Sequence, residues 1–247
     1  MSEAMRMWVE IIFNIGYLIA VWTLVIMMTR RQHAVAPENR AVAKRVMWAF
    51  ALLALGDTGH VGFRVLAYSI GGLETQSIVL GIPISWVGLG ALATAITVTF
   101  FYMLMVDVWR LRYNKPLGVA GWFLLAMGIF RLIIMLFPQN EWSQVVPPQP
   151  WGLIRNLPLI IMGLGVMVLI LRDAYRTNDL PFKWIGWCIL ASYAFYTPVI
   201  LFVQQVPALG MLMIPKTLAY IAIAVIAYRS LYTRPQSVTA TVPVAGR

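Results

Sequence analysis

Apolar residues along this chain come in seven runs of about twenty, and a helix of that length crosses the ~30 Å hydrocarbon core of a bilayer. The connections between the runs are short and more polar. This pattern predicts an all-α integral membrane protein, a bundle of seven transmembrane helices. The expected spans are 8–29, 46–69, 85–109, 119–137, 153–171, 184–203 and 211–232.

The basic residues alternate from one connection to the next. Of the 19 Lys and Arg residues, 14 lie in the connections after spans one, three and five, in the last turn of span seven (Arg229) and in the segment that ends the chain. Cytoplasmic connections carry the excess of Lys and Arg, so the pattern predicts an N-terminus outside and a C-terminus inside. We expect a protein of a prokaryotic cytoplasmic (inner) membrane.

No connection is long enough to form a second domain. Residues 1–232 are therefore expected to form a single transmembrane domain. The segment 233–247 contains Pro, Thr and Val without a helical period, which predicts a disordered cytoplasmic tail. The first span lacks a basic region and a small-residue cleavage site before it, so we interpret it as a retained helix.

Composition excludes several classes of protein. The chain is 61% hydrophobic and 11% charged, whereas a soluble domain is nearer a quarter charged. The net charge of +10 follows the orientation pattern and does not indicate a nucleic-acid partner. The single cysteine, Cys188, rules out an intrachain disulfide.

The second span carries the most unusual group of residues. Asp57, His60 and Arg64 follow one another at i, i+3 and i+7, so they share one face of a helix. Ionisable groups at this depth are costly and mark a functional site by default. Asp57 beside His60 is a candidate catalytic pair, in which the carboxylate would hold the imidazole as a proton acceptor.

Other spans place polar residues at the same level. With the predicted orientation, they all lie in the outer half of the bundle, which implies a polar cavity that opens outward. These residues are Glu10, Asn14, Arg131, Arg155, Asn156 and Lys216. Tyr193, Tyr196 and Tyr220 would add hydroxyl groups to the cavity wall, and Tyr220 lies one turn from Lys216.

The charges in this layer do not balance. If Glu10 and Asp57 each take one base, about two cations remain without partners, at a cost of at least ~2.5–3.5 kcal/mol each. An anionic small molecule or a lipid head group would supply the missing charge. Two alternatives stay open: Arg155 near a span end would extend to the interface, and an Asp57–Lys216 ion pair would only fix helix packing.

The leading hypothesis is a binding protein, either a sensor (receptor) or a carrier, for an anionic or lipid-like ligand. The expected ligand-binding residues are Asn14, Asp57, His60, Arg64, Arg131, Asn156, Tyr196, Lys216 and Tyr220. A second hypothesis is an intramembrane enzyme on lipid-derived substrates that uses Asp57 and His60, although no Ser or Cys nucleophile has an evident place beside them. A third is an accessory subunit that packs against other membrane proteins. Whether the protein is an enzyme stays open.

A lysine in the last of seven helices, together with Tyr196-Thr197-Pro198-Val199 in the sixth, resembles the microbial rhodopsins in outline. The resemblance implies retinal bound to Lys216. Asp57 would have to serve as its counterion, because the third span has no arginine–aspartate pair. With two histidines in the chain, His33 and His60, no metal site is expected.

Overall fold

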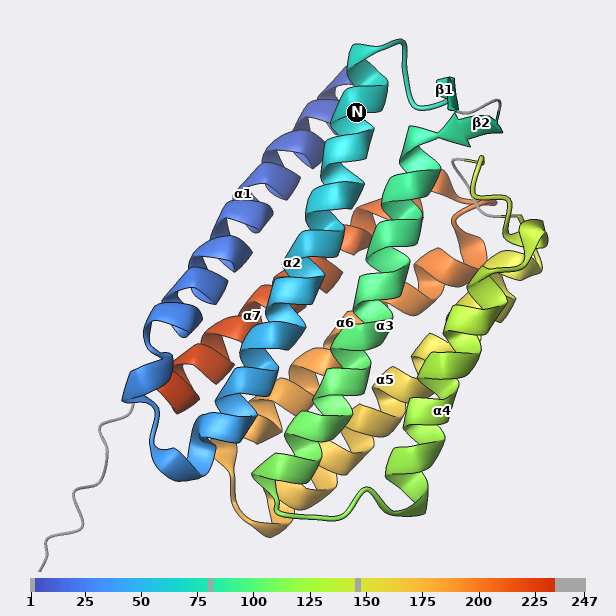
Figure 1. Ribbon diagram of the computed structural model, residues 1–247. Helices are drawn as coiled ribbons and strands as arrows, with labels where there is room; N and C mark the ends of the chain where they lie inside the picture. Colours follow the sequence, from blue (N-terminus) through green and yellow to red (C-terminus); the bar gives the residue numbers. More distant parts are fainter. Residues whose placement is uncertain (1–2, 80–81, 145–147, 234–247) are drawn as a thin grey trace, which may run out of the picture.

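The computed structural model describes residues 3–79, 82–144 and 148–233. Seven long helices make up most of this part of the chain (Figure 1). Each is long and apolar enough to cross a membrane, so the predicted all-α bundle of seven membrane-length helices is confirmed. Most of the predicted tail, 234–247, lies outside the described residues. The helices are α1 (Glu3–Arg30), α2 (Arg40–Ser69), α3 (Trp86–Arg112), α4 (Gly118–Met135), α5 (Trp151–Arg176), α6 (Leu180–Phe202) and α7 (Met213–Tyr232).

Several helices extend beyond the apolar runs that predicted them. α2 begins at Arg40, six residues before the expected span, and α5 continues to Arg176, five residues after it. Arg and Lys are good helix formers, so the helices continue through their basic turns. The hydrophobic pattern therefore located the apolar part of each helix rather than its ends.

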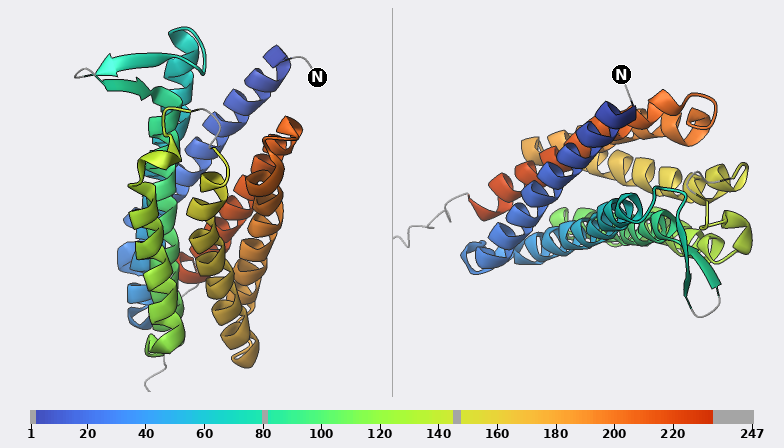
Figure 2. Two further views of the ribbon diagram at one scale, coloured as in Figure 1. Left: turned by 90° about the vertical axis from the view of Figure 1, so that its right-hand side faces the viewer. Right: turned by 90° about the horizontal axis from the view of Figure 1, so that it is seen from above.

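The helices form a ring in chain order. Each packs against the next along the chain, and α7 returns to pack against α1. The two views of Figure 2 show the tilted α1 and α7 beside the more upright α2, α3 and α4. We call the end of the bundle where α2 leads into the β-strands the hairpin end, and the opposite end, where α7 ends at Tyr232, the basic end.

A small β-hairpin connects α2 to α3. Strands β1 (Gln76–Val79) and β2 (Ile82–Ser85) pair antiparallel, with Gln76 opposite Ser85. The Ser85 hydroxyl then accepts a hydrogen bond from the Gly88 amide (3.1 Å) and caps α3. The sequence analysis assigned no structure to this connection, because its apolar residues are too few to cross a membrane.

α2 and α3 form the most extensive helix pair, and glycines bring them close. A Cβ atom added at Gly90 would lie 2.9 Å from the Cα of His60 and 3.1 Å from its carbonyl oxygen. One added at Gly56 would collide with Thr97. Small residues allow such close backbone approach between helices in lipid, so these glycines set the position of α2 against α3.

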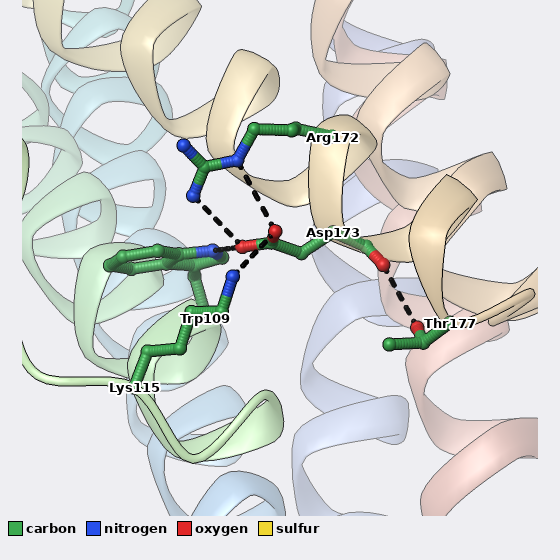
Figure 3. A network of polar contacts seen from close by, with 5 residues as sticks. All are labelled: Trp109, Lys115, Arg172, Asp173 and Thr177. Atoms are coloured by element: carbon green, nitrogen blue, oxygen red, sulfur yellow. Dashed lines mark hydrogen bonds and ion pairs between the residues drawn. The ribbon is translucent and has the colours of Figure 1, made fainter.

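Ion pairs join the helices at the basic end. Asp173 of α5 is 1% exposed, and its carboxylate accepts hydrogen bonds from Trp109 Nε1 (2.8 Å) and Lys115 Nζ (2.7 Å) and pairs with Arg172 (3.2 Å), as Figure 3 shows. Asp107 of α3 pairs with Arg45 of α2 at 2.5 Å. These contacts hold α2, α3 and α5 together at this end.

The glycine contact predicts that Gly90→Ala destabilises the bundle. The added methyl group meets helix backbone, which cannot move aside as a flexible side chain can, so we expect a loss of about 1–3 kcal/mol. The matched control is Gly62→Ala in α2, where a Cβ atom meets nothing within 4 Å. Thermal unfolding followed by circular dichroism measures both variants. Equal melting temperatures for the two would contradict this account.

The Asp173 cluster predicts that Asp173→Asn is strongly destabilising. The variant leaves Lys115 and Trp109 without their shared carboxylate, at a cost of about 3 kcal/mol in chemical or thermal unfolding. Arg172→Gln serves as the control, because the Arg172 side chain is 44% exposed and its loss should cost less than about 1 kcal/mol. A larger effect of Arg172→Gln than of Asp173→Asn would show that the buried carboxylate is not the centre of the cluster.

Candidate functional site

A cavity of about 1360 Å³ lies between the helices in the half of the bundle toward the hairpin end. All seven helices contribute to its wall, together with the connections around Glu74 and Trp142 and the 3₁₀ helix η4 (Pro207–Leu212). The wall includes every residue that the sequence analysis assigned to a ligand site: Asn14, Asp57, His60, Arg64, Arg131, Asn156, Tyr196, Lys216 and Tyr220. Glu10 lies on α1, and its side chain is outside the described residues. The ligand-binding roles of these residues remain predictions.

Asp57 is held by hydroxyl groups from two neighbouring helices. Tyr17 of α1 donates to one carboxylate oxygen (2.6 Å), and Thr94 of α3 donates to the other (2.5 Å). Within the described part of the chain, no ion pair joins Asp57 to Lys216 or to another cation. The alternative that an Asp57–Lys216 pair fixes helix packing is therefore wrong.

His60 lies one turn from Asp57, yet no hydrogen bond joins them. Its Nδ1 atom is buried and has no hydrogen-bond partner among the described residues. The expected carboxylate–imidazole pair is therefore not formed, because both oxygens of Asp57 already face α1 and α3. His60 remains part of the cavity wall, where α2 touches α3 at Gly90.

Arg131 of α4 is the most deeply buried charge in the cavity wall, at 2% exposure. Its guanidinium donates to the carbonyl oxygens of Arg155 (2.9 Å) and Ala95 (2.7 Å), to the Thr99 hydroxyl (2.5 Å) and to Asn156 Oδ1 (3.2 Å). These acceptors come from α3 and α5, and all of them are neutral. Arg131 thus joins three helices without a carboxylate partner in the described chain.

Two further cations of the wall contact aromatic rings. The guanidinium carbon of Arg155 lies 4.2 Å from the centroid of the Trp142 ring. Lys216 Nζ lies 4.5 Å from the Tyr196 centroid and 5.5 Å from that of Tyr220. Arg155 is only 9% exposed, so the expectation that it extends to the membrane interface is wrong. Trp142, from the connection after α4, covers it.

Aromatic side chains close the cavity toward the basic end. The hydroxyls of Tyr102 and Tyr220 are 2.8 Å apart, and Tyr193 donates to the carbonyl oxygen of Leu159 (2.9 Å). Beneath them, Phe101 packs edge-on against Tyr220, with ring centroids 5.4 Å apart, and against Phe50 at 5.3 Å. This aromatic layer separates the polar half of the bundle from the apolar core and the ion pairs of the basic end.

Sequence reasoning missed three residues that shape the site. Tyr17 follows Asn14 by three positions and so shares its helix face, a spacing that could have identified it. Thr94 belongs to a Gly- and Ala-rich run in α3 that indicated only close packing. Trp142 lies in a connection, and no periodic signal places such a residue over the helix that follows.

Two further sources of evidence about the function of this site are metal-binding residues and similarity to known proteins. In the described residues no group of three or more His, Cys, Asp or Glu side chains is placed to hold a metal ion. Comparisons with protein-family models, with curated proteins and with solved structures found no match to this chain. Function must therefore be argued from the geometry and charge of the cavity.

The contacts of Arg131 predict that even Arg131→Lys destabilises the bundle. A lysine ammonium has three N–H donors in a compact group and cannot reach all the acceptors that the planar guanidinium joins. Buried oxygen acceptors that lose their N–H donor should lower the free energy of unfolding by about 1–3 kcal/mol, measured by thermal or denaturant unfolding. The control is Arg229→Lys at an exposed position of α7, which should unfold like the wild type. Unchanged stability of Arg131→Lys would refute the role of Arg131 in joining the helices.

Proposed function

We propose that the protein is a multi-pass membrane binding protein, a sensor or a carrier, that holds an anionic ligand in this cavity. The single observation that carries the proposal is Arg131, which is 2% exposed and has only neutral acceptors in the described chain. Arg155 and Lys216 add two more cations to the same wall. A negative group bound among them would offset the cost of burying this charge.

The orientation of the cavity follows from the charges of the connections. The residues around the basic end include Arg45, Arg110, Lys115 and Arg172, and the positive-inside tendency assigns this end to the cytoplasm. The hairpin end, and the cavity with it, would then face the outer side of a prokaryotic cytoplasmic membrane. The ligand would enter from outside or from the outer leaflet.

Binding is favoured over the three other hypotheses. An enzyme that uses Asp57 and His60 needs the two side chains to act together, and they share no hydrogen bond. Retinal on Lys216 needs a counterion, and no ion pair joins this lysine to a described carboxylate. An accessory subunit would not require three cations in the wall of one cavity.

Native mass spectrometry of the full chain purified in mild detergent tests the proposal. We expect a co-purifying anion on the wild type, and about tenfold lower occupancy in Lys216→Gln, which removes one charge-assisted contact. The matched control is Lys183→Gln, because Lys183 also lies over a tyrosine ring, 4.9 Å from the Tyr175 centroid, but outside the cavity. Equal occupancy in the three proteins, or a wild type that neither co-purifies with an anion nor binds an added one, would refute the proposed function.

A further inference from the structure

Arg155 and Lys216 share an unusual property for cations in a membrane-length bundle. Each has aromatic contacts, and within the described residues neither donates a hydrogen bond or forms an ion pair. An aromatic face attracts a cation, but it does not replace the oxygen acceptors that N–H groups require. Both side chains line the same cavity, so their free donors are available to one ligand.

The number of free donors indicates a ligand rich in oxygen atoms. A guanidinium carries five N–H groups and an ammonium three, and those of Arg155 and Lys216 are all without acceptors in the described chain. Arg131 uses most of its own donors on Arg155, Ala95, Thr99 and Asn156. A carboxylate has two oxygens to offer, whereas a terminal phosphate has three that accept strong hydrogen bonds.

The balance of charge leads to the same class of ligand. In the deep part of the wall, three cations (Arg131, Arg155 and Lys216) face one carboxylate, Asp57, which leaves an excess of two positive charges. Arg64 and Glu74 also line the cavity, and their opposite charges leave this excess among the described residues unchanged. A ligand with one negative charge would leave a cation uncompensated, whereas a phosphomonoester carries a charge of about −1.5 to −2 at neutral pH.

Tyr196 and Asn156 lie in the same cavity wall as the two cations. Tyr196 links them: its ring faces Lys216 of α7, and its hydroxyl donates to Asn156 Oδ1 (3.3 Å), which also accepts from Arg131. Arg155 lies next to Asn156 on α5 and reaches the cavity over Trp142. Arginine favours forked contacts with phosphate, and lysine acts as a point charge.

We propose that the cavity binds a phosphomonoester group, with Arg155 and Lys216 as its direct partners and Arg131 as the fixed charge behind them. This inference rests on the proposed function and names the class of its ligand. The phosphate group belongs either to a soluble compound or to the head group of a lipid in the outer leaflet. Both sources present the same dianionic oxygens to the same side chains.

The test uses the full chain in nanodiscs of phosphatidylcholine, titrated with inorganic phosphate and, separately, with acetate by isothermal calorimetry. We expect phosphate to bind at least about tenfold more tightly than acetate, since it offers more charge and more acceptors. A parallel set of nanodiscs with added phosphatidic acid tests the lipid source by native mass spectrometry. Binding of phosphate indicates a soluble ligand, and retention of phosphatidic acid alone indicates a lipid head group; either result supports the proposal.

Variants show whether the named side chains make the contact. Arg155→Gln and Lys216→Gln should each weaken binding by about 10- to 100-fold, whereas Lys183→Gln should leave it unchanged. Lys216→Arg keeps the charge and should retain most of the binding, which separates a ligand contact from a folding defect. Melting temperatures recorded on the same samples identify any variant that does not fold.

Two results would overturn the phosphate proposal while leaving the anion site intact. One is acetate binding as tightly as phosphate. The other is a co-purifying anion in the wild type when neither phosphate nor phosphatidic acid binds. If no anion co-purifies with the wild type and it binds neither phosphate, acetate nor phosphatidic acid, the proposed function itself is refuted. Loss of phosphate binding in Lys183→Gln equal to that in Lys216→Gln would also reject the assignment of the direct partners.

Discussion

The burial of the Arg131 guanidinium, with no carboxylate partner among the described residues, is the constraint on which the polar half of this bundle depends. A cation at such a depth costs at least ~2.5–3.5 kcal/mol on membrane-insertion scales, and hydrogen bonds to neutral oxygens offset only part of this cost. α3 and α5 supply those oxygens, two of them from the backbone and two from the side chains of Thr99 and Asn156. Arg131 therefore joins α4 to both α3 and α5.

The charged side chains at the two ends of the bundle have different kinds of partner. At the basic end each of Asp107, Asp173 and Asp179 forms an ion pair with at least one Lys or Arg. In the cavity, cations outnumber carboxylates, and aromatic rings occupy the places next to Arg155 and Lys216. The aromatic layer at Tyr102 and Phe101 separates the two regions. Ion pairs thus connect the helices at the basic end, whereas cation–π contacts hold these two cations of the cavity wall.

Hydrophobic pattern alone was sufficient to predict the seven helices, since each is a long apolar run. It also brought residues from five helices to one level, because helix direction alternates and rise per residue is fixed. It could not predict which residue each polar side chain contacts. Asp57 bonds Tyr17 and Thr94 rather than His60, and Arg155 turns under Trp142 rather than toward the interface. These contacts depend on how each helix is rotated about its axis and on the path of the connections. The hydrophobic period of the sequence reports neither.

For the proposed anion site, the aromatic contacts of Arg155 and Lys216 account for an excess of positive charge when no ligand is bound. Cation–π attraction is worth about 0.5–2 kcal/mol, enough to hold each side chain in place but less than a charge-assisted hydrogen bond to an anion. In the proposed site, oxygen atoms of an anion can therefore replace these cation–π contacts with hydrogen bonds, and no ion pair has to break first. A carboxylate at the same position would satisfy the cations permanently and close the site to other anions. In the proposed site, Trp142, Tyr196 and Tyr220 stand where acidic partners would otherwise be, which leaves the cations accessible to an anion.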